Sequence, residues 1–166
     1  MKKVTQPSLR ESSRNTRRVV APSFIGLKPA SLASSYAKQR NRGSDTAHEV
    51  MLRRELWHLG LRYRKTVRTL PGKPDIVFSR RRLAIFCDGD FWHGREWRKL
   101  RLKLKAGSNS SYWLKKIQSN IQRDRHNQTL LQCAGWTVIR LWESDIKRDP
   151  KKEAALIKRE IEKLSH

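Results

Sequence analysis

Two aspartates stand where short apolar segments meet polar turns. Asp75 begins the segment Asp75–Phe78, directly after a proline- and glycine-containing turn, and Asp88 follows the next apolar segment, Leu83–Cys87. If the two segments form a hairpin, both carboxylates lie at one edge of the sheet. Paired hard oxygen ligands suit Mg²⁺, which keeps several waters and takes one or two protein carboxylates. The pattern favours a metal site, and the alternative is that each aspartate only caps a turn.

His93 and Glu49 are two further candidates for the chemistry. His93 follows Asp88 by five residues in a loop that contains glycine. An imidazole beside a metal is suited to proton transfer, because its ordinary pKa lies near 6.5. Glu49 stands near the start of an expected helix, where its carboxylate could orient a water, although an exposed glutamate without a role is also common there.

The loop between Asp88 and His93 also contains the adjacent aromatics Phe91 and Trp92. Two large aromatic side chains are unusual in a loop of glycine, aspartate and histidine. They either fill the core beneath the loop or insert between bases, which is a known way to open and kink a duplex.

The chain of 166 residues has 38 Lys and Arg against 15 Asp and Glu, a net charge of +23. A charge of this size points to a polyanionic partner, because neutralising phosphates releases condensed counterions. Nucleic acid is the expected partner, and an anionic membrane or another acidic partner is the alternative. The expected phosphate contacts come from a segment before the first helix and from the basic stretch after His93: Lys38, Arg40, Arg42, Arg95, Arg98 and Lys99.

The composition also excludes several classes. No stretch approaches the ~20 apolar residues that a membrane helix needs, so no membrane partner is expected. Two cysteines, Cys87 and Cys133, are too few for a disulfide framework, and the polar start does not resemble a secretion signal. We therefore expect a cytoplasmic, nucleoid-associated protein.

The periodicity predicts elements in the order αβββαβα within one domain, 36–166, that follows a basic, largely flexible extension, 1–35. Helices are expected over 46–59, 111–134 and 150–164, and strands over 61–67, 75–78, 83–87 and 136–142. The basic stretch 95–105 is ambiguous between helix and loop. A strand that follows a long crossover helix can join the sheet in parallel, so the expected fold is α/β, a mixed four-stranded sheet flanked by helices.

Several motifs together resemble the very short patch repair (Vsr) endonuclease family. The similarity covers about residues 36–146, and the family's core is restriction-endonuclease-like, of the PD-(D/E)XK type. The motifs that carry it are 40–49, with Asp45-Thr46 and Glu49; 70–77, with Pro74-Asp75; 84–93, ending in Phe91-Trp92-His93; 112–124, ending in Arg123-Asp124; and 135–143, with Gly135-Trp136 and Trp142-Glu143.

The resemblance implies a Mg²⁺-dependent endonuclease whose partner is double-stranded DNA. By that resemblance Asp75 binds the metal, the main-chain carbonyl of Cys87 is a second ligand, His93 is the catalytic histidine and Glu49 helps to hold water. The aromatic pair at 91 and 92 would insert beside a T:G mismatch, and the enzyme would nick 5′ of the mispaired T that arises from deaminated 5-methylcytosine. Mismatch-repair proteins and a companion DNA cytosine methyltransferase are the partners implied, and we expect a monomer.

The chain departs from the family pattern at three places. Typical members have Thr-His where this chain has Cys87-Asp88, so Asp88 could supply a second carboxylate to the metal. The family's zinc ligands are replaced after His93 by Gly94, Arg95 and Glu96, so we expect no structural zinc. Lys38 aligns with an inserting methionine, which weakens the expectation of T:G specificity. The alternatives are a restriction- or defence-type nuclease without mismatch preference and a non-catalytic DNA-binding protein.

Overall fold

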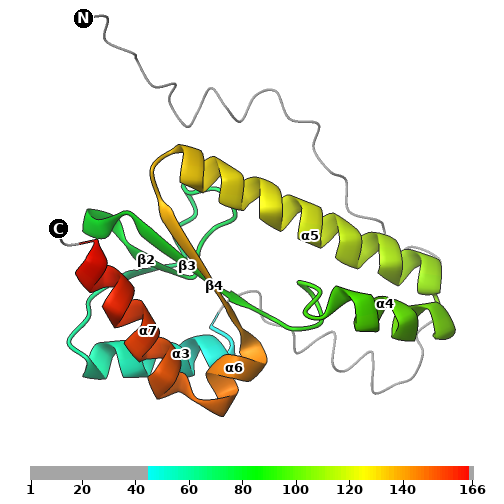
Figure 1. The fold of residues 1–166 in the computed structure, drawn as a ribbon, viewed down its shortest axis with the longest axis horizontal. Coiled ribbons are helices and arrows are strands. Elements are labelled where there is room, and N and C mark those ends of the chain that lie inside the picture. The colour runs from blue at the N-terminus through cyan, green and yellow to red at the C-terminus, as the bar shows by residue number, and fades with distance from the viewer. Residues whose placement is uncertain (1–44, 165–166) are drawn as a thin grey trace, which may run out of the picture.

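A computed structural model of the protein describes residues 45–164, and it contains one four-stranded sheet with helices on both faces (Figure 1). The elements, in chain order, are α3 (Ala47–His58), β1 (Arg64–Lys65), β2 (Ile76–Phe78), the 3₁₀ turn η1 (Ser79–Arg81), β3 (Leu83–Asp88), α4 (Trp97–Ala106), α5 (Ser110–Cys133), β4 (Thr137–Trp142), α6 (Glu143–Arg148) and α7 (Pro150–Lys163). The predicted extension, 1–35, and the first part of the predicted domain, 36–44, lie outside the described residues. The predicted phosphate contacts Lys38, Arg40 and Arg42 are in this first part of the domain.

The sheet has the strand order β1-β2-β3-β4. The first three strands form an antiparallel meander, in which Ile76 pairs with Ile85. The last strand runs parallel to β3, with Cys87 opposite Leu141. In the chain, the long helix α5 connects β3 to β4. It runs back over one face of the sheet, so β4 can enter beside β3 in the same direction. The predicted mixed four-stranded sheet flanked by helices is therefore confirmed.

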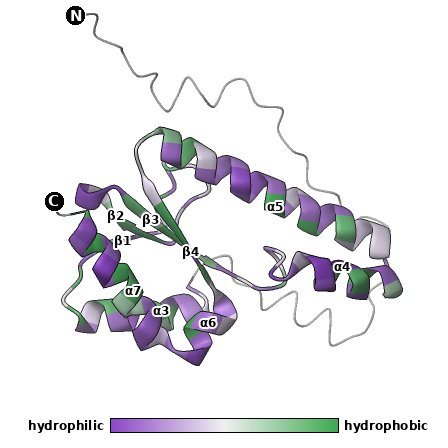
Figure 2. Ribbon diagram, in the orientation of Figure 1, coloured by the Kyte–Doolittle hydropathy of each residue, from purple (hydrophilic) through white to green (hydrophobic). Residues whose placement is uncertain are grey.

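Alternate residues of β2 and β3 face opposite sides of the sheet, and each side has its own core. Helices α3, α6 and α7 cover one face, and α5 covers the other (Figures 1 and 2). The first core contains Leu52, Leu56, Ile76, Phe78, Leu83, Ile85, Cys87, Leu141, Ile146, Ala154 and Ile157. The second core, beneath α5, contains Ala84, Phe86 and Leu131, with Leu70, Trp136 and Val138 packed against it.

Some predicted details were wrong. The strand expected over 61–67 is only Arg64–Lys65, because the chain turns at Thr66, whose φ is 49°. Helix α6 was not predicted, and 97–106 of the ambiguous stretch is helical. Trp57 on α3 is 56% exposed, and the guanidinium of Arg62 lies 3.7 Å from its ring centroid.

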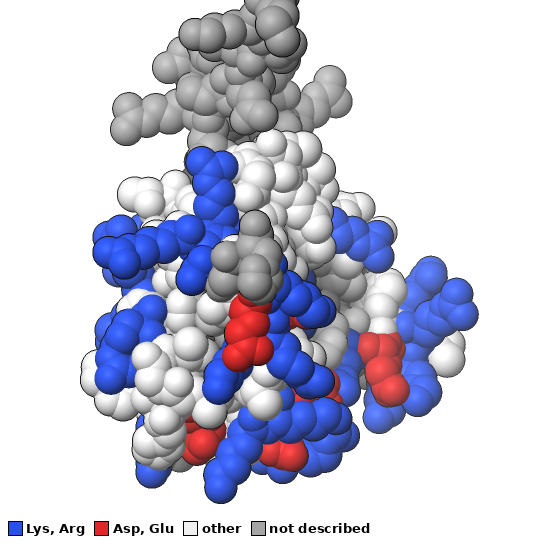
Figure 3. All heavy atoms as spheres, turned by 60° about the vertical axis from the view of Figure 1, so that its left-hand side comes forward, with Lys and Arg blue, Asp and Glu red and all other residues white. Residues whose placement is uncertain are grey.

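Basic side chains are spread over the face shown in Figure 3, with only a few acidic side chains among them. Among the described residues, no helix is long and apolar enough to cross a membrane.

Candidate active site

The carboxylates that the sequence singled out line one cleft of about 1210 Å³. The cleft lies where β2 begins and where β3 and β4 end, and α3 and α5 form its walls. The acidic residues that line it are Asp45, Glu49, Asp75, Asp88, Asp124 and Glu143. In a chain of net charge +23, this concentration of carboxylates needs a local reason.

Asp75 lies directly before β2, opposite the end of β3. Its main-chain N–H donates to the carbonyl of Ile85, and its Oδ2 accepts from the N–H of Cys87 at 2.8 Å. Burial raises the pKa of Asp75 to about 6, against the hydrogen bond from Cys87, and the charges of Glu49 and Asp88 raise it further. Burial and two neighbouring carboxylates thus both disfavour the ionised form of Asp75.

The main chain of Cys87 is oriented by the same pairing. In a β-strand the N–H and C=O of one residue point toward the same neighbouring strand. Because the N–H of Cys87 points to Asp75, its carbonyl also points to the β2 side, at the mouth of the cleft. Burial raises the pKa of the Cys87 thiol well above its usual value, so the sulfur is a neutral thiol. The carbonyl oxygen is therefore the atom of Cys87 that could bind a cation.

Glu49 is buried on α3, and both of its oxygens are held. Oε1 accepts from the hydroxyl of Thr46 at 2.6 Å, and Oε2 accepts from the N–H of Asp45 at 3.0 Å. Arg53, one turn further along α3, lies 3.8 Å from Oε2 and also pairs with the carboxylate of Asp45. These contacts hold the Glu49 carboxylate in one orientation within the cleft.

Asp88 is 3% exposed, and both of its oxygens accept from one guanidinium. Arg140, on the neighbouring strand β4, donates through Nε at 2.6 Å and through Nη2 at 2.7 Å. Such a bidentate pair is geometrically specific and strong. Asp88 does lie beside Asp75 in the cleft, as predicted, but a metal could reach its oxygens only by competing with Arg140.

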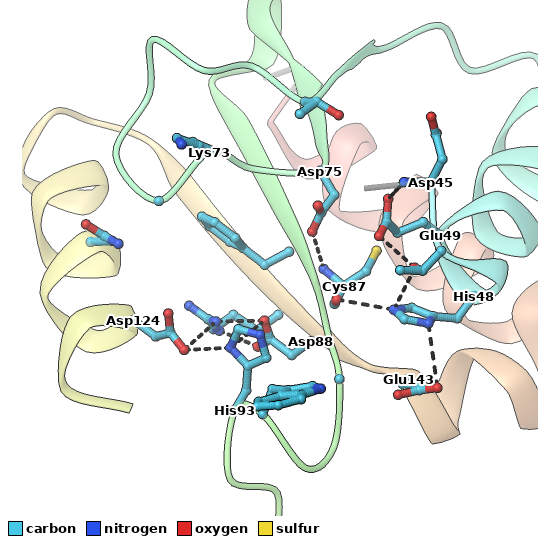
Figure 4. Close-up of a pocket in the computed structure, with 18 of the residues that line it drawn as sticks. Asp45, His48, Glu49, Lys73, Asp75, Cys87, Asp88, His93, Asp124 and Glu143 are labelled. Carbon is cyan, nitrogen blue, oxygen red and sulfur yellow. Dashed lines mark hydrogen bonds and ion pairs between the residues drawn. The ribbon is translucent and has the colours of Figure 1, made fainter. Parts of the chain in front are cut away.

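His93 forms a couple with an aspartate that the sequence reasoning did not select. Its Nδ1 lies 2.6 Å from Oδ2 of Asp124 on α5, and Asp124 also lies 3.5 Å from Arg140 (Figure 4). Burial would raise the pKa of Asp124, but the hydrogen bond and charge of His93, with the charges of Arg140 and Arg123, lower it overall. An ionised carboxylate only accepts, so Nδ1 carries the proton and Nε2 is left to exchange one.

Gly94 and Asn120 fasten the loop that carries His93 to α5. A Cβ on Gly94 would lie 2.6 Å from Cδ1 of Ile121, and the φ of Gly94 is +70°, so a larger residue would be strained and would displace the Ile121 side chain. The side chain of Asn120 donates to the carbonyl of Trp92 at 2.9 Å. The loop therefore brings His93 to Asp124 through close contact with the helix.

Phe91 and Trp92 lie on this loop in an aromatic cluster with Trp113 of α5. The ring centroids of Phe91 and Trp113 are 5.5 Å apart, and those of Trp92 and Trp113 are 5.9 Å apart. Phe91 is 37% exposed, whereas Trp92 is partly buried and lines the cleft. The two residues thus combine packing against α5 with an exposed aromatic edge.

The predicted phosphate contacts that the structure describes differ in their surroundings. Arg95 donates to Ser144 and to Asp145, whose carboxylate lies 2.9 Å away, and the hydrogen bond to Asp145 raises the pKa of the Arg95 guanidinium. Arg98 and Lys99 are exposed on α4, where Lys99 pairs with Glu96 at 3.2 Å. In this structure Arg95 therefore joins the loop to α6, while Arg98 and Lys99 are accessible to a ligand.

The sequence reasoning missed Asp124, Arg140 and His48 as members of the site. The motif Arg123-Asp124 was visible, but nothing local distinguishes it from an exposed pair on a helix. Arg140 lies within the predicted strand 136–142, where a single polar residue gives no sign of a role in a site. The parallel register pairs Arg140 with Phe86, two residues before Asp88 on the same face of the sheet, so this register could have indicated the contact between Arg140 and Asp88.

We expect Asp88→Ala to separate two roles of this residue. Because Arg140 occupies both oxygens, the variant should nick more slowly while the Mg²⁺ concentration for half-maximal activity changes little. The measurement is the nicking rate across a Mg²⁺ titration. A clear rise in the midpoint would instead make Asp88 a direct ligand, and an unchanged rate and midpoint would remove it from the mechanism.

The model of one protein family, DNA mismatch endonuclease Vsr, matches residues 31–99. The Type II nicking enzyme V.HpaIIP of Haemophilus parainfluenzae is 40% identical over 125 residues, which are 75% of this chain and 86% of that protein. The Type II nicking enzyme V.NaeI of Lentzea aerocolonigenes is 38% identical over 151 residues, 84% and 85% of the two chains. The DNA mismatch endonuclease Vsr of Escherichia coli is 35% identical over 116 residues, 69% and 72%.

Proposed function

The chain belongs to the Vsr family of DNA endonucleases, and from that premise we propose that it nicks one strand of duplex DNA, 5′ of the T in T:G mismatches, with Mg²⁺ as cofactor. The observation that carries the proposal is the cleft itself, in which the His93–Asp124 couple faces Asp75 and the Cys87 carbonyl. These are the parts that hydrolysis of a phosphodiester needs: a place for a cation, a group that exchanges a proton and a group that orients water.

The residues present fit a magnesium ion. Among the described residues, no group of three or more His, Cys, Asp and Glu side chains is placed to hold a metal alone. Mg²⁺ does not require such a group, because it keeps several waters and takes few protein ligands. A carboxylate and a carbonyl oxygen are hard ligands for a divalent cation. Burial, and after it the charges of Glu49 and Asp88, raise the pKa of Asp75, and a bound cation would favour the ionised form of this carboxylate.

Asp75 and the Cys87 carbonyl would hold the ion, which would stabilise the charge that develops on the scissile phosphate. Glu49, fixed by Thr46 and Asp45, orients a water through a carboxylate oxygen. His93 exchanges a proton at Nε2, while Asp124 keeps Nδ1 protonated and holds the ring in one orientation. Arg140 links Asp88 to Asp124 and so holds the two sides of the cleft together.

The test is a cleavage assay with duplexes labelled on each strand. Purified protein is incubated with Mg²⁺ or with EDTA, and with matched and T:G-mismatched duplexes of the same sequence. We expect one nick, 5′ of the mispaired T, only with Mg²⁺. Binding without cleavage of any duplex would leave a DNA-binding protein on a nuclease fold and overturn the proposal.

A second candidate is a nicking enzyme without mismatch preference, serving restriction or defence. Lys38 stands where the family has an inserting methionine, and this residue lies outside the described part of the chain. In the same assay this candidate requires equal nicking of the matched and mismatched duplexes.

We expect the double substitution Phe91→Ala and Trp92→Ala to remove selective binding of a mismatched duplex. Stacking of an aromatic on a base is worth ~1–3 kcal/mol, so a loss of roughly tenfold to a hundredfold should be measurable. Binding of matched DNA should persist, because phosphate contacts do not read the bases. The measurement is fluorescence anisotropy on both duplexes.

Trp57→Ala is the control for this pair, since Trp57 is an exposed aromatic on α3 outside the cleft. It should leave both affinities unchanged. If the double variant instead loses both affinities equally and melts at a lower temperature, the pair serves only the packing against Trp113.

A further inference from the structure

His48 is a buried imidazole in the cleft that the proposed mechanism leaves unused. It lies in the first turn of α3, directly before Glu49, and is 6% exposed. Its Nε2 lies 3.2 Å from Oγ1 of Thr46 and 3.4 Å from the carbonyl oxygen of Cys87 (Figure 4). One ring nitrogen thus touches a partner of Glu49 and the main-chain group that we assign to the metal.

The position of the hydrogen on the His48 ring follows from the two oxygen atoms near Nε2. The hydroxyl of Thr46 has a single hydrogen, which it donates to Glu49 at 2.6 Å. Its oxygen can therefore only accept from His48, and the Cys87 carbonyl can only accept as well. Nε2 of His48 must carry a hydrogen, which the two oxygens share.

The opposite side of the ring faces a carboxylate. Nδ1 of His48 lies 3.8 Å from Oε1 of Glu143, which is beyond hydrogen-bond range but within the range of an ion pair. Glu143, at the start of α6, is itself held by Lys147 at 2.5 Å. The ring is thus bounded by oxygen atoms on both sides, which fixes its orientation between α3, β3 and α6.

We propose that His48 is a positioning residue for the nicking reaction. Its Nε2–H aligns the Thr46 hydroxyl on Glu49 and, by occupying one lone pair of the Cys87 carbonyl, directs the other lone pair toward the place of the cation. His48 thereby fixes the orientation of both the Glu49 carboxylate, which orients water, and the Cys87 carbonyl, which would bind the cation. This inference rests on the proposed function, because it assigns His48 a role in that same site.

Two variants of His48 distinguish the proposed hydrogen-bonding role of Nε2 from a role in packing alone. His48→Leu keeps a similar volume without a donor, whereas His48→Gln carries an amide N–H at about the reach of Nε2. Loss of an outer partner of a metal ligand typically costs about 10–100-fold in metal affinity or activity. We expect the Leu variant to lose this much in Mn²⁺ affinity, measured by electron paramagnetic resonance without DNA, and in single-turnover nicking rate.

We expect the Gln variant to recover most of both quantities. Duplex affinity in EDTA should be unchanged in both variants, since His48 is only 6% exposed and offers a duplex little surface. The matched control is His58→Leu, the same substitution at the other end of α3, where the His58 side chain is 62% exposed. It should behave as the wild type. A Gln variant as impaired as the Leu variant would assign the loss to packing and overturn the proposal.

Thr46→Val removes the hydroxyl that joins His48 to Glu49. If the two residues act through one chain of hydrogen bonds, the rate losses of Thr46→Val and His48→Leu should not multiply in the double variant. Fully multiplicative losses would overturn the shared role.

A ¹⁵N–¹H spectrum of the histidine rings gives a reading that does not depend on cleavage. It should show a hydrogen on Nε2 of His48 in the wild type, and an unprotonated Nε2 would overturn the proposal. If the wild type nicks no duplex, the proposed function fails, while Mn²⁺ affinity and this spectrum still decide the placement of His48. If the wild type nicks and His48→Leu keeps its rate and Mn²⁺ affinity, only the present inference fails.

Discussion

Asp75→Asn should abolish nicking while duplex binding is kept or becomes tighter. The substitution removes the carboxylate that would hold the cation, and several kcal/mol of charge stabilisation correspond to a fall of roughly 10³-fold or more in rate. It also removes a negative charge from a cleft that already contains Glu49 and Asp88, so the phosphate backbone is repelled less. The rate is measured in single turnover at saturating duplex, and affinity by anisotropy in EDTA.

The matched control is Asp149→Asn. Asp149 caps α7 by accepting from the N–H of Lys152 at 2.9 Å, and asparagine caps helices equally well. It should cut and bind as the wild type does. A rate for Asp75→Asn near that of the wild type at saturating Mg²⁺ would show that the metal site is elsewhere.

The same variant carries a prediction about stability without metal. The pKa of Asp75 is about 6 in the folded chain, against 3.8 for an aspartate in the unfolded chain, so the folded state binds this proton more tightly. The stability that the proton contributes is present below pH 3.8 and is lost as the pH rises through 6. A difference of this size corresponds to at most about 3 kcal/mol in the free energy of unfolding.

In EDTA we therefore expect Asp75→Asn to be more stable than the wild type at pH 7.5, with the difference shrinking toward pH 4. Urea denaturation at several pH values measures it. Adding Mg²⁺ should stabilise the wild type and not the variant, because only the wild type keeps the carboxylate. A difference that is the same at pH 4 and pH 7.5 would contradict the raised pKa.

Asp124→Asn should lower the nicking rate by roughly 10²–10⁴-fold, the range for loss of a positioned general acid–base. The physical reason is the tautomer of His93. Asn can offer an amide N–H to Nδ1, which favours the hydrogen on Nε2 and removes the nitrogen that exchanges a proton. The Mn²⁺ affinity should stay near the wild-type value, since Asp124 holds the imidazole rather than the ion.

The measurement is the single-turnover rate as a function of pH, together with Mn²⁺ affinity, and Asp149→Asn again serves as the control. A loss that appears mainly in Mn²⁺ affinity would place Asp124 among the metal ligands. A rate equal to that of the wild type would separate His93 from the chemistry.

Local patterns predicted much of the fold. The apolar segments 75–78 and 83–87 became β2 and β3, and the long helix 111–134 became α5, within one residue at each end. Short elements were less predictable. The six-residue helix α6 has no side-chain cap at its start, and β1 has only two residues because the chain turns at Thr66.

For the site, the sequence by itself determined that Asp75 and Asp88 would lie at one edge of the sheet, because a short hairpin leaves few other arrangements, and that His93 would follow five residues later. Only the tertiary structure decided what each does there. Arg140 reaches Asp88 across the β3–β4 register, and Asp124 reaches His93 across the packing of the loop on α5. Arg140 and Asp88 are 52 residues apart in the sequence, and His93 and Asp124 are 31 apart. Contacts between residues so far apart in the sequence depend on how strands and helices pack rather than on local spacing.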